Sequence, residues 1–429
     1  MKIYFASFGC KVNRYETDVM AQEFEKIGGE KVSSPEGCDV CVINSCTVTA
    51  NADADLQKFI RSVKRRTPEC VIALTGCFAQ AFPEKAAELG ADIITGSGKK
   101  TSLPRLVQDF FLTKNKVCEV GIVPREFEPM SLSHGSGTRA FIKIQDGCDM
   151  FCTYCIIPFA RGHIRSKPLD DLRREAENLV RAGHRELVLT GINICCYGRE
   201  NRLRLVDAIE TVCAVKGDFR VRLGSIEPEM ISDEDIARLK ALDKLCPQFH
   251  LSLQSGCDRV LSAMNRHYDT ALFTELVRKL RTAFPDCAIT TDIMAGFPTE
   301  TEQEHIISMD YIGKIGFAKA HVFPYSERSG TKAAEMDGRL DSTVKNRRAR
   351  ELISAARQSA LEYNQKFVGR TVEVLFERET EGKPHAGHSR EYHLVKVPNN
   401  GEASWHKLMK RVRITEAYAE YLVGVDADG

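Results

Sequence analysis

The sequence has almost no excess of charge of either sign. Its 429 residues include 60 Lys and Arg and 59 Asp and Glu, which leaves a net charge of +1. A protein that attracts nucleic acid through the field of its whole surface carries a clear excess of basic residues. Any contact of this chain with nucleic acid therefore has to come from local basic stretches.

Long apolar runs are absent as well. No stretch approaches the roughly 18 consecutive apolar residues that a membrane-spanning helix needs. The first residues, MKIYFASFGC, contain one lysine and too short an apolar stretch for a secretory signal. The sequence therefore predicts a cytoplasmic protein with no membrane partner.

Tryptophan occurs once, whereas cysteine occurs 16 times. In a reducing cytosol, cysteines act as thiols, metal ligands or catalysts and seldom form structural disulfides. The chain is also too long for a mini-domain held by disulfides, since its length allows about three domains with a core each. The cysteines are therefore the residues in which to look for chemistry.

Residues 1–125 alternate short buried-strand patterns with amphipathic helical patterns. The strand patterns cover residues 2–7, 40–44 and 71–75 and are rich in Val, Ile and aromatic residues. This alternation predicts an α/β fold with a small parallel sheet. A polar stretch rich in Ser and Gly, residues 126–138, predicts a linker.

Residues 139–367 continue with a longer alternation, and residues 368–425 contain alternating apolar residues. Six strand–helix units in the first segment predict a partial (β/α)6 barrel, whose chemistry is expected at the carboxyl ends of its strands. The second segment predicts a small β-barrel. The six strands are expected at residues 141–145, 186–190, 220–225, 250–254, 288–294 and 319–324.

Three cysteines closely follow the first of these strands. Cys148, Cys152 and Cys155 have the spacing C-x3-C-x2-C and lie on a loop at the reactive end of the barrel. Thiolates at this spacing can bind three corners of a [4Fe–4S] cluster and leave the fourth iron open for a small molecule. The alternatives are three buried thiols that only pack and a zinc site with His163 as its fourth ligand.

A second set of cysteines is spread over the N-terminal segment. Cys10, Cys46 and Cys77 each follow a predicted strand. Because the ends of parallel strands converge at one edge of a sheet, these thiols can meet and hold a second cluster. One small buried cysteine per strand is the competing interpretation. Asn13 and Asn44 are expected at the same edge, where their amides would donate hydrogen bonds to sulfur.

The C-x3-C-x2-C motif resembles that of radical S-adenosylmethionine (SAM) enzymes, and the chain as a whole resembles the radical SAM methylthiotransferases. The resemblance implies an N-terminal methylthiotransferase domain (1–125), a radical SAM domain (139–367) and a TRAM-type RNA-binding barrel (368–425). It also implies two [4Fe–4S] clusters and SAM as the source of a radical and of a methyl group. The implied metal ligands are Cys10, Cys46, Cys77, Cys148, Cys152 and Cys155, of which the last three are catalytic.

Three residues are implied as contacts to SAM. Tyr154, the aromatic residue before the last cysteine of the motif, matches a position near the adenine. Glu227, in the family-like stretch GSIEP, and Gln254, in the stretch HLSLQSG, would hold the methionine or the ribose. Ordinary solvation at a strand end is the alternative for both.

Branches of this family act on isopentenyladenosine in tRNA, on threonylcarbamoyladenosine in tRNA, and on an aspartate of a ribosomal protein. Residues 10–13 (CKVN) are similar to the threonylcarbamoyl branch, whereas Gln-Met is typical between Cys and Asn in the isopentenyl branch. The resemblance thus implies methylthiolation at C2 of N6-threonylcarbamoyladenosine beside the anticodon, with tRNA, an electron donor and a sulfur donor as partners. A basic residue is expected beside the carboxylate of this nucleoside. The candidates are Arg161, Arg165, Arg266 and Arg328.

RNA contact is expected at two basic stretches. Arg347 and Arg348 belong to the first, and Lys407, Lys410 and Arg411 belong to the second, which also contains the tryptophan as a base-stacking residue. A solvated charged face is the alternative for each stretch. Two other functions stay open: a non-catalytic RNA-binding protein with structural clusters, and a radical SAM enzyme whose N-terminal domain holds no cluster.

The other cysteines are expected to pack in the core. Cys38 and Cys41 form a C-x2-C pair, but no second pair completes a zinc site. Cys195 and Cys196 adjoin the expected cavity, and the sequence assigns them no role.

Overall fold

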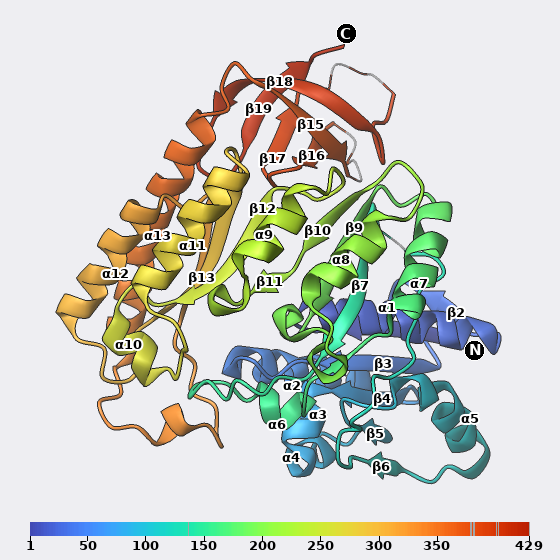
Figure 1. The fold of residues 1–429 in the computed structure, drawn as a ribbon. Helices are drawn as coiled ribbons and strands as arrows, with labels where there is room; N and C mark the ends of the chain where they lie inside the picture. The colour runs from blue at the N-terminus through green and yellow to red at the C-terminus, as the bar shows by residue number, and fades with distance from the viewer. Residues whose placement is uncertain (136, 378–379, 381, 400, 402, 429) are drawn as a thin grey trace.

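The computed structural model describes residues 1–135, 137–377, 380, 382–399, 401 and 403–428. A sheet covered by helices lies at one end of the molecule, an open barrel lies in the middle, and a small closed barrel lies at the other end (Figure 1). Within the described ranges, no helix is long and apolar enough to cross a membrane.

The N-terminal sheet has six parallel strands in the order β2-β1-β3-β4-β5-β6. The three strands predicted in this segment are confirmed, and β3 and β4 each run one residue further. The other three strands have only three residues each, too few to show a period. The strands are β1 (Lys2–Ser7), β2 (Glu30–Val32), β3 (Val40–Ser45), β4 (Val71–Gly76), β5 (Ile93–Thr95) and β6 (Val117–Glu119).

Helices cover both faces of this sheet because side chains alternate along its buried strands. Cys41 and Ile43 of β3 belong to a core beneath α2, whereas Val40 and Val42 belong to a core that includes Met20 of α1. Such two-sided burial gives the continuous apolar runs seen in the sequence. The helices are α1 (Lys11–Lys26), α2 (Ala50–Arg66), α3 (Cys77–Ala81), α4 (Pro83–Glu88), the 3-10 turn η1 (Lys100–Ser102) and α5 (Leu103–Thr113).

The middle of the chain forms two four-stranded sheets that together make an open barrel. Their orders are β10-β9-β7-β8 and β11-β12-β13-β14, and only the short β8 runs antiparallel to its neighbour. The six predicted strands are confirmed, although the third is divided into β10 and β11. The strands are β7 (Arg139–Asp146), β8 (Arg165–Ser166), β9 (Glu186–Gly191), β10 (Arg220–Leu223), β11 (Ser225–Ile226), β12 (Gln248–Gln254), β13 (Ala288–Ala295) and β14 (Lys319–Pro324).

Helices lie on the outer side of the open barrel (Figure 1). Leu251 on β12 and Ile289 on β13 belong to the large apolar core. On the same two strands, His250 and Asp292 form an ion pair outside that core. Because side chains alternate along a strand, the inner face is the polar one. The helices are α6 (Ile157–Arg161), α7 (Leu169–Arg181), η2 (Ile194–Cys196), η3 (Arg199–Asn201), α8 (Leu205–Cys213), η4 (Pro228–Met230), α9 (Asp233–Lys240), α10 (Asp258–Ala263), α11 (Thr270–Ala283), α12 (Glu302–Ile315), η5 (Lys332–Glu335) and α13 (Ser342–Gln365).

The predicted linker, residues 126–138, forms no helix or strand where the structure describes it, but it is not a free tether. Met130 and Leu132 are buried in the core of the open barrel. The hydroxyl of Tyr15 on α1 donates to the carbonyl of Met130 over 3.0 Å, and the amide of Leu132 donates to Glu175 over 2.8 Å. This segment therefore fastens the N-terminal sheet to the open barrel.

The C-terminal segment forms the predicted small barrel, closed by five strands in the order β15-β16-β17-β19-β18. Tyr392, between β16 and β17, reaches into the open barrel, where its hydroxyl accepts a hydrogen bond of 2.8 Å from Arg139. The guanidinium of Arg222 lies over the Tyr392 ring, 4.6 Å from its centroid. The strands are β15 (Thr371–Phe376), β16 (His385–Ser389), β17 (Leu394–Val397), β18 (Met409–Ala417) and β19 (Leu422–Asp426).

Candidate functional site: two cysteine loops joined by one arginine

The first cysteine loop follows β7 and is held by backbone hydrogen bonds from several elements. The amide of Cys148 donates to the carbonyl of Gly162 over 3.0 Å. Thr153 donates its amide to Met264 and accepts from the amide of Ala333, over 3.1 and 2.8 Å. The loop is therefore fixed by segments on both sides of the open barrel before any ligand binds.

Gly147 begins this loop in a conformation that only glycine adopts easily. Its φ is +75°, and a Cβ built there would lie 1.9 Å from the carbonyl oxygen of His163. Gly147→Ala is therefore expected to destabilise the fold by about 3 kcal/mol, measured by urea unfolding, and to lower the iron content. Gly183→Ala is the matched control, since Gly183 also has a positive φ, +87°, but no atom lies within 4 Å of its added Cβ. Equal stability losses in the two variants would refute the role of the close contact.

Two of the three thiols of the first loop, those of Cys148 and Cys155, are poor anions without a bound cation. Burial raises the pKa of Cys148 to about 11 and that of Cys155 to about 12, and the neighbouring Cys152 thiol adds to both shifts. Metal binding releases such protons and supplies the charge that the thiolates lack. The donor set therefore fits an iron–sulfur group.

A zinc site fits the same residues less well. His163, the proposed fourth ligand, donates to or accepts from Asp149 over 2.8 Å, and its side chain is 65% exposed. Among the residues that the structure describes, no three Cys, His, Asp or Glu side chains are grouped around a single ion position. Thiols that are spread along a loop suit a cube of four irons, in which each cysteine binds its own corner.

Polar side chains without partners border this loop. The carboxamide of Asn193 lies beside the Cys148 thiol, and its oxygen and nitrogen have no other partner among the described residues. The Oε1 of Gln254 is buried without a partner, and Gln254 has a φ of 66°. Buried polar atoms are rarely left unpaired in folded proteins, so these groups are poised for a polar ligand such as SAM. Asn193 closely follows the carboxyl end of β9, a strand-end position from which the sequence could have indicated it.

Arg266 joins the loop to Glu227. Its Nη1 donates to the Cys152 sulfur over 3.2 Å, and its Nη2 forms an ion pair with Glu227. Burial raises the pKa of Glu227, although Arg266 acts in the opposite direction. Tyr154 packs against an apolar cluster that contains Met264 and Phe297. Two of the three residues expected at SAM, Glu227 and Tyr154, thus lie at this loop.

The second set of cysteines comes together at the edge where the order of the N-terminal sheet reverses, between β1 and β3. Cys10 precedes α1, Cys46 follows β3, and Cys77 opens α3 directly after β4. Burial raises the pKa of Cys46 to about 12, and Cys77 and Cys10 contribute further, so the three thiols are close enough to interact. A Cβ added to Gly9, whose φ is +96°, would lie 2.5 Å from the Cys46 sulfur. Ligands bind at such reversal points in open α/β sheets.

Asn13 and Asn44 brace this edge instead of donating to sulfur. The Asn13 amide donates to the carbonyls of Phe8 and Ser45 over 2.8 and 3.0 Å. The Asn44 amide donates to the carbonyl of Asn13 over 3.0 Å. The expectation that these amides donate to sulfur is therefore wrong: their donors hold the loops, and the Asn13 oxygen accepts from the Cys10 thiol over 3.8 Å.

Arg161 connects the two cysteine loops. It ends α6, directly after the first loop, and is fully buried. Its Nε donates to the Cys77 sulfur over 3.0 Å, and its Nη2 donates to Asn13 over 2.6 Å and to Glu16 over 3.1 Å. The guanidinium thus stabilises negative charge on a sulfur of the second set. The sequence did not indicate this role, because it depends on contacts between residues 84 or more positions apart along the chain.

A buried network of charges surrounds Arg161. Glu16 also pairs with Lys143 over 2.9 Å and with Lys100 over 3.2 Å, and Lys143 pairs with Asp146 over 3.1 Å. Burial alone would raise the pKa of Glu16, but Arg161, Lys100 and Lys143 hold it well below its usual range. These residues come from the N-terminal sheet and from β7, so the network fixes the two parts relative to each other.

The arginines expected at a substrate carboxylate are all engaged. Arg161 binds Glu16, Arg165 pairs with Asp146 over 3.0 Å, and Arg266 pairs with Glu227. The fourth, which is buried like the others, pairs with a carboxylate of α2: Arg328 binds Asp53 over 2.7 Å. All four guanidiniums are thus held in ion pairs, although the buried Nε of Arg328 has no hydrogen-bond partner among the described residues.

The expected RNA contacts have different outcomes. Arg348 is only 4% exposed and pairs with Glu300 over 2.8 Å, so the prediction that it binds RNA is wrong. The tryptophan of the second stretch, Trp405, is buried in the core of the small barrel and stacks on His385, so it offers no face to a base.

The other four basic residues stay predictions for RNA contact. Three of them pair with acids: Arg347 with Glu302 over 2.7 Å, Lys410 with Asp426, and Arg411 with Asp428 over 3.8 Å. The Arg411 side chain is nevertheless 69% exposed, whereas Lys407 is half-buried.

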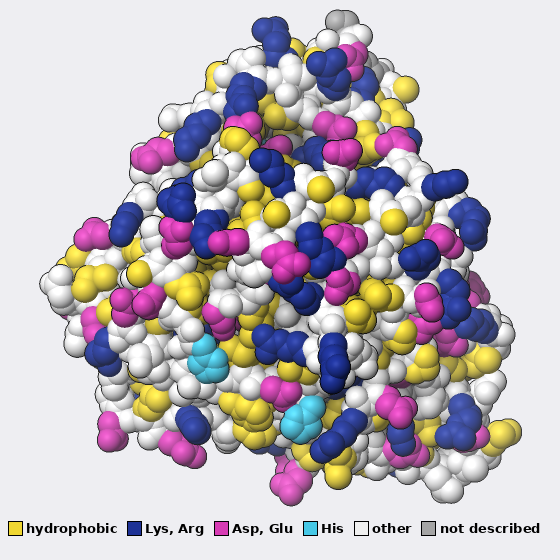
Figure 2. Space-filling view, viewed as in Figure 1, with side chains coloured by type: hydrophobic (Ala, Val, Ile, Leu, Met, Phe, Trp, Pro, Cys, Tyr) yellow, Lys and Arg dark blue, Asp and Glu magenta, His cyan; other side chains and the backbone are white. Residues whose placement is uncertain are grey.

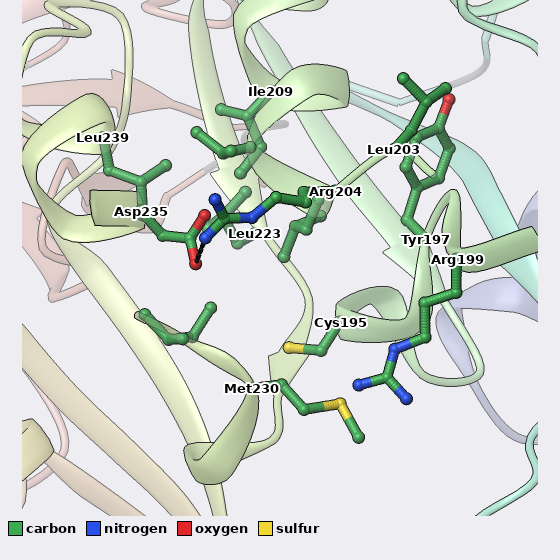
Figure 3. Close-up of a pocket in the computed structure, with 13 residues that line it drawn as sticks. Cys195, Tyr197, Arg199, Leu203, Arg204, Ile209, Leu223, Met230, Asp235 and Leu239 are labelled. Carbon is green, nitrogen blue, oxygen red and sulfur yellow. Dashed lines mark ion pairs between the residues drawn. The ribbon is translucent and has the colours of Figure 1, made fainter. Parts of the chain in front are cut away.

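Cys195 and Cys196 lie beside the site. Both are buried, and the Cys195 sulfur accepts from the backbone amide of Glu227 over 3.3 Å. Cys195 and Met230 point into a cavity of about 170 Å³, across which Arg204 pairs with Asp235 (Figure 3). None of the six cysteines of the two loops lines this cavity, so it is a side pocket.

Two protein-family models match this chain, and each covers one of the two cysteine sets. Residues 142–312 match the family model "Radical SAM superfamily", and residues 2–96 match the model "Uncharacterized protein family UPF0004". Among solved structures, the radical SAM methyltransferase TsrM from Kitasatospora setae, with cobalamin and a [4Fe–4S] cluster bound, has a TM-score of 0.61 at 13% identity over 78% of this chain and 76% of its own. This likeness concerns the fold alone.

Curated relatives match nearly the whole chain. The threonylcarbamoyladenosine tRNA methylthiotransferase MtaB of Bacillus subtilis is 36% identical over 98% of this chain and 95% of its own, and that of Thermotoga maritima is 35% identical over 98% and 96%. A tRNA-2-methylthio-N(6)-dimethylallyladenosine synthase from Clostridium perfringens is 34% identical over 87% of this chain and 86% of its own.

Proposed function

The chain belongs to the radical SAM methylthiotransferases, and we propose that it adds a methylthio group to C2 of N6-threonylcarbamoyladenosine beside the anticodon of tRNA. The observation that carries this proposal is the pairing of two three-cysteine loops through Arg161. Relatives named for this reaction match the chain over 98% of its length. The proposed partners are tRNA, a one-electron donor and a sulfur donor, all in the cytoplasm.

We assign the cluster ligands as the sequence predicts. Cys148, Cys152 and Cys155 would hold the cluster that binds SAM, and the second set of cysteines would hold the other. When bound, the clusters and SAM supply the radical, the sulfur and the methyl group. The proposed domains are residues 1–125, 139–367 and 368–425.

The chain's own residues prepare the site for this chemistry. Asn193 and Gln254 offer unpaired polar atoms to SAM, and Glu227 is oriented by Arg266. Arg161 holds the Cys77 sulfur and fixes the second loop against the first. The two loops are thus held close together, as a reaction that needs both clusters requires.

The substrate is tested in a strain that lacks the gene. Mass spectrometry of its tRNA nucleosides is expected to show loss of the methylthio-threonylcarbamoyl nucleoside and accumulation of the precursor without the methylthio group. Retention of the methylthio-threonylcarbamoyl nucleoside would overturn the proposal. Loss of the methylthio-isopentenyl nucleoside in its place would assign the chain to the other tRNA branch.

A further inference from the structure

We propose that Lys11 binds the carboxylate of the threonylcarbamoyl group and thereby selects this substrate over adenosines with an uncharged N6 substituent. The inference rests on the proposed function and names the residue that reads the substrate's charge. Arginine was the expected residue type, but each of the four candidate arginines is engaged in an ion pair within the protein.

Lys11 lies between the second cysteine set and the barrel. It is the first residue of α1 and directly follows Cys10, so its ammonium stays within one side-chain length of that cysteine. Helix α1 packs against β7, and Tyr15, one turn further along the helix, belongs to the core of the open barrel. Lys and Arg side chains gather near the centre of the face shown in Figure 2, where the N-terminal sheet meets the barrel.

The ammonium of Lys11 interacts electrostatically with groups of the inner barrel face. Although its side chain is exposed, burial by the surrounding protein lowers the pKa of Lys11. Arg139 and Arg222 lower it further, while Tyr392 and Asp292 oppose them. Lys11 also helps to lower the pKa of His321. These neighbours belong to β7, β10, β13, β14 and the turn between β16 and β17, and α1 itself packs against β7 and β9.

The charged neighbours of Lys11 have partners of their own. Arg222 pairs with Glu186 over 2.8 Å, Arg139 pairs with Glu377 over 3.0 Å, and Asp292 pairs with His250 over 3.1 Å. Lys11 forms no ion pair or side-chain hydrogen bond with any residue in the described part of the chain. It is therefore an exposed cation at the start of α1, beside the barrel, that is available to an anionic ligand.

The negative charge of an incoming carboxylate and the positive charge of this ammonium would neutralise each other. A carboxylate that leaves water for a protein cavity needs an opposite charge or several hydrogen bonds. An uncharged substituent would leave the partly desolvated ammonium unpaired, and sites built to bind a polar group discriminate strongly against ligands that lack it. Lys11 thus favours the charged nucleoside and disfavours the uncharged one.

The test measures binding of anticodon stem-loop RNAs to the cluster-loaded enzyme under anaerobic conditions. One RNA carries N6-threonylcarbamoyladenosine, a second carries the methyl ester of its carboxylate, and a third carries adenosine. For Lys11→Gln we expect the Kd of the first RNA to rise about tenfold or more, with unchanged Kd values for the other two. Lys11→Arg is expected to restore most of the preference, and iron content confirms that each variant is loaded.

Lys319→Gln is the matched control. Lys319 is another exposed lysine of the barrel, but it is the first residue of β14 and does not adjoin a cysteine of either set. An unchanged Kd for the charged RNA in Lys11→Gln, or a loss in Lys319→Gln alone, would overturn the inference. If the wild-type enzyme neither prefers the charged RNA to its ester nor methylthiolates it, the proposed function itself fails.

Discussion

Replacement of Cys148, Cys152 and Cys155 by alanine is expected to reduce reductive cleavage of SAM to the level of the buffer. The three thiols are the donor set of the first loop. Burial raises the pKa of Cys148 and of Cys155, so these two need a bound cation to become thiolates. Without them the protein has no cluster to pass an electron to SAM. Release of 5′-deoxyadenosine under anaerobic, reducing conditions measures the effect.

Two controls accompany this variant. Cys213→Ala removes a half-buried thiol at the end of α8 and is expected to leave cleavage unchanged. Replacement of Cys10, Cys46 and Cys77 is expected to retain SAM cleavage while abolishing methylthio transfer. Persistent cleavage after loss of the three thiols of the first loop would show that the radical mechanism is wrong for this protein.

Arg161→Met is expected to destabilise the protein by about 3–5 kcal/mol and to remove iron from the second cysteine set. Removal of one partner from a buried ion pair leaves an uncompensated buried charge, which costs roughly that amount. Glu16, fully buried, would lose its contacts to both terminal nitrogens of Arg161. Urea unfolding and iron content measure the two effects.

The stability that Glu16 contributes depends on pH with a definite sign. Burial would raise the pKa of Glu16, but its three cationic neighbours hold it well below the usual value in the folded protein. The contribution is therefore fully present above the usual pKa of glutamate and is lost as the pH falls toward the lowered folded value. Arg161→Met is expected to weaken this loss on acidification, because the folded pKa moves upward.

A surface arginine serves as the control for this variant. Arg278 pairs with Glu275 over 2.6 Å, but both side chains are about half exposed or more. Its replacement by methionine is expected to change stability too little to measure. The same small effect for Arg161→Met, with full iron content, would contradict the role assigned to the buried network.

The parts of the fold that depend on local sequence were predictable. Strands such as β1 and β14 carry their own periodic pattern, and both begin and end at the predicted residues. The short strands β5 and β6 gave no such pattern. The second cysteine set was predictable in outline because each cysteine follows a strand of one parallel sheet.

Features that depend on distant contacts were not predictable. Arg161 reaches Cys77 and Asn13 only because the open barrel docks on the N-terminal sheet. Arg348 belongs to a basic run on α13, and its buried side chain pairs with Glu300, just before α12. The sequence of the run does not show which side of α13 is buried. Lys11 belongs to the motif CKVN in the sequence, but only the fold shows which groups surround its side chain.

The two-cluster claim is tested most directly by anaerobic iron and sulfide analysis of the purified chain. Two [4Fe–4S] clusters predict about eight irons and about eight sulfides per chain. About four of each should remain after either set of cysteines is replaced by alanine. About four irons in the unmodified chain, with no loss on replacement of Cys10, Cys46 and Cys77, would contradict the account.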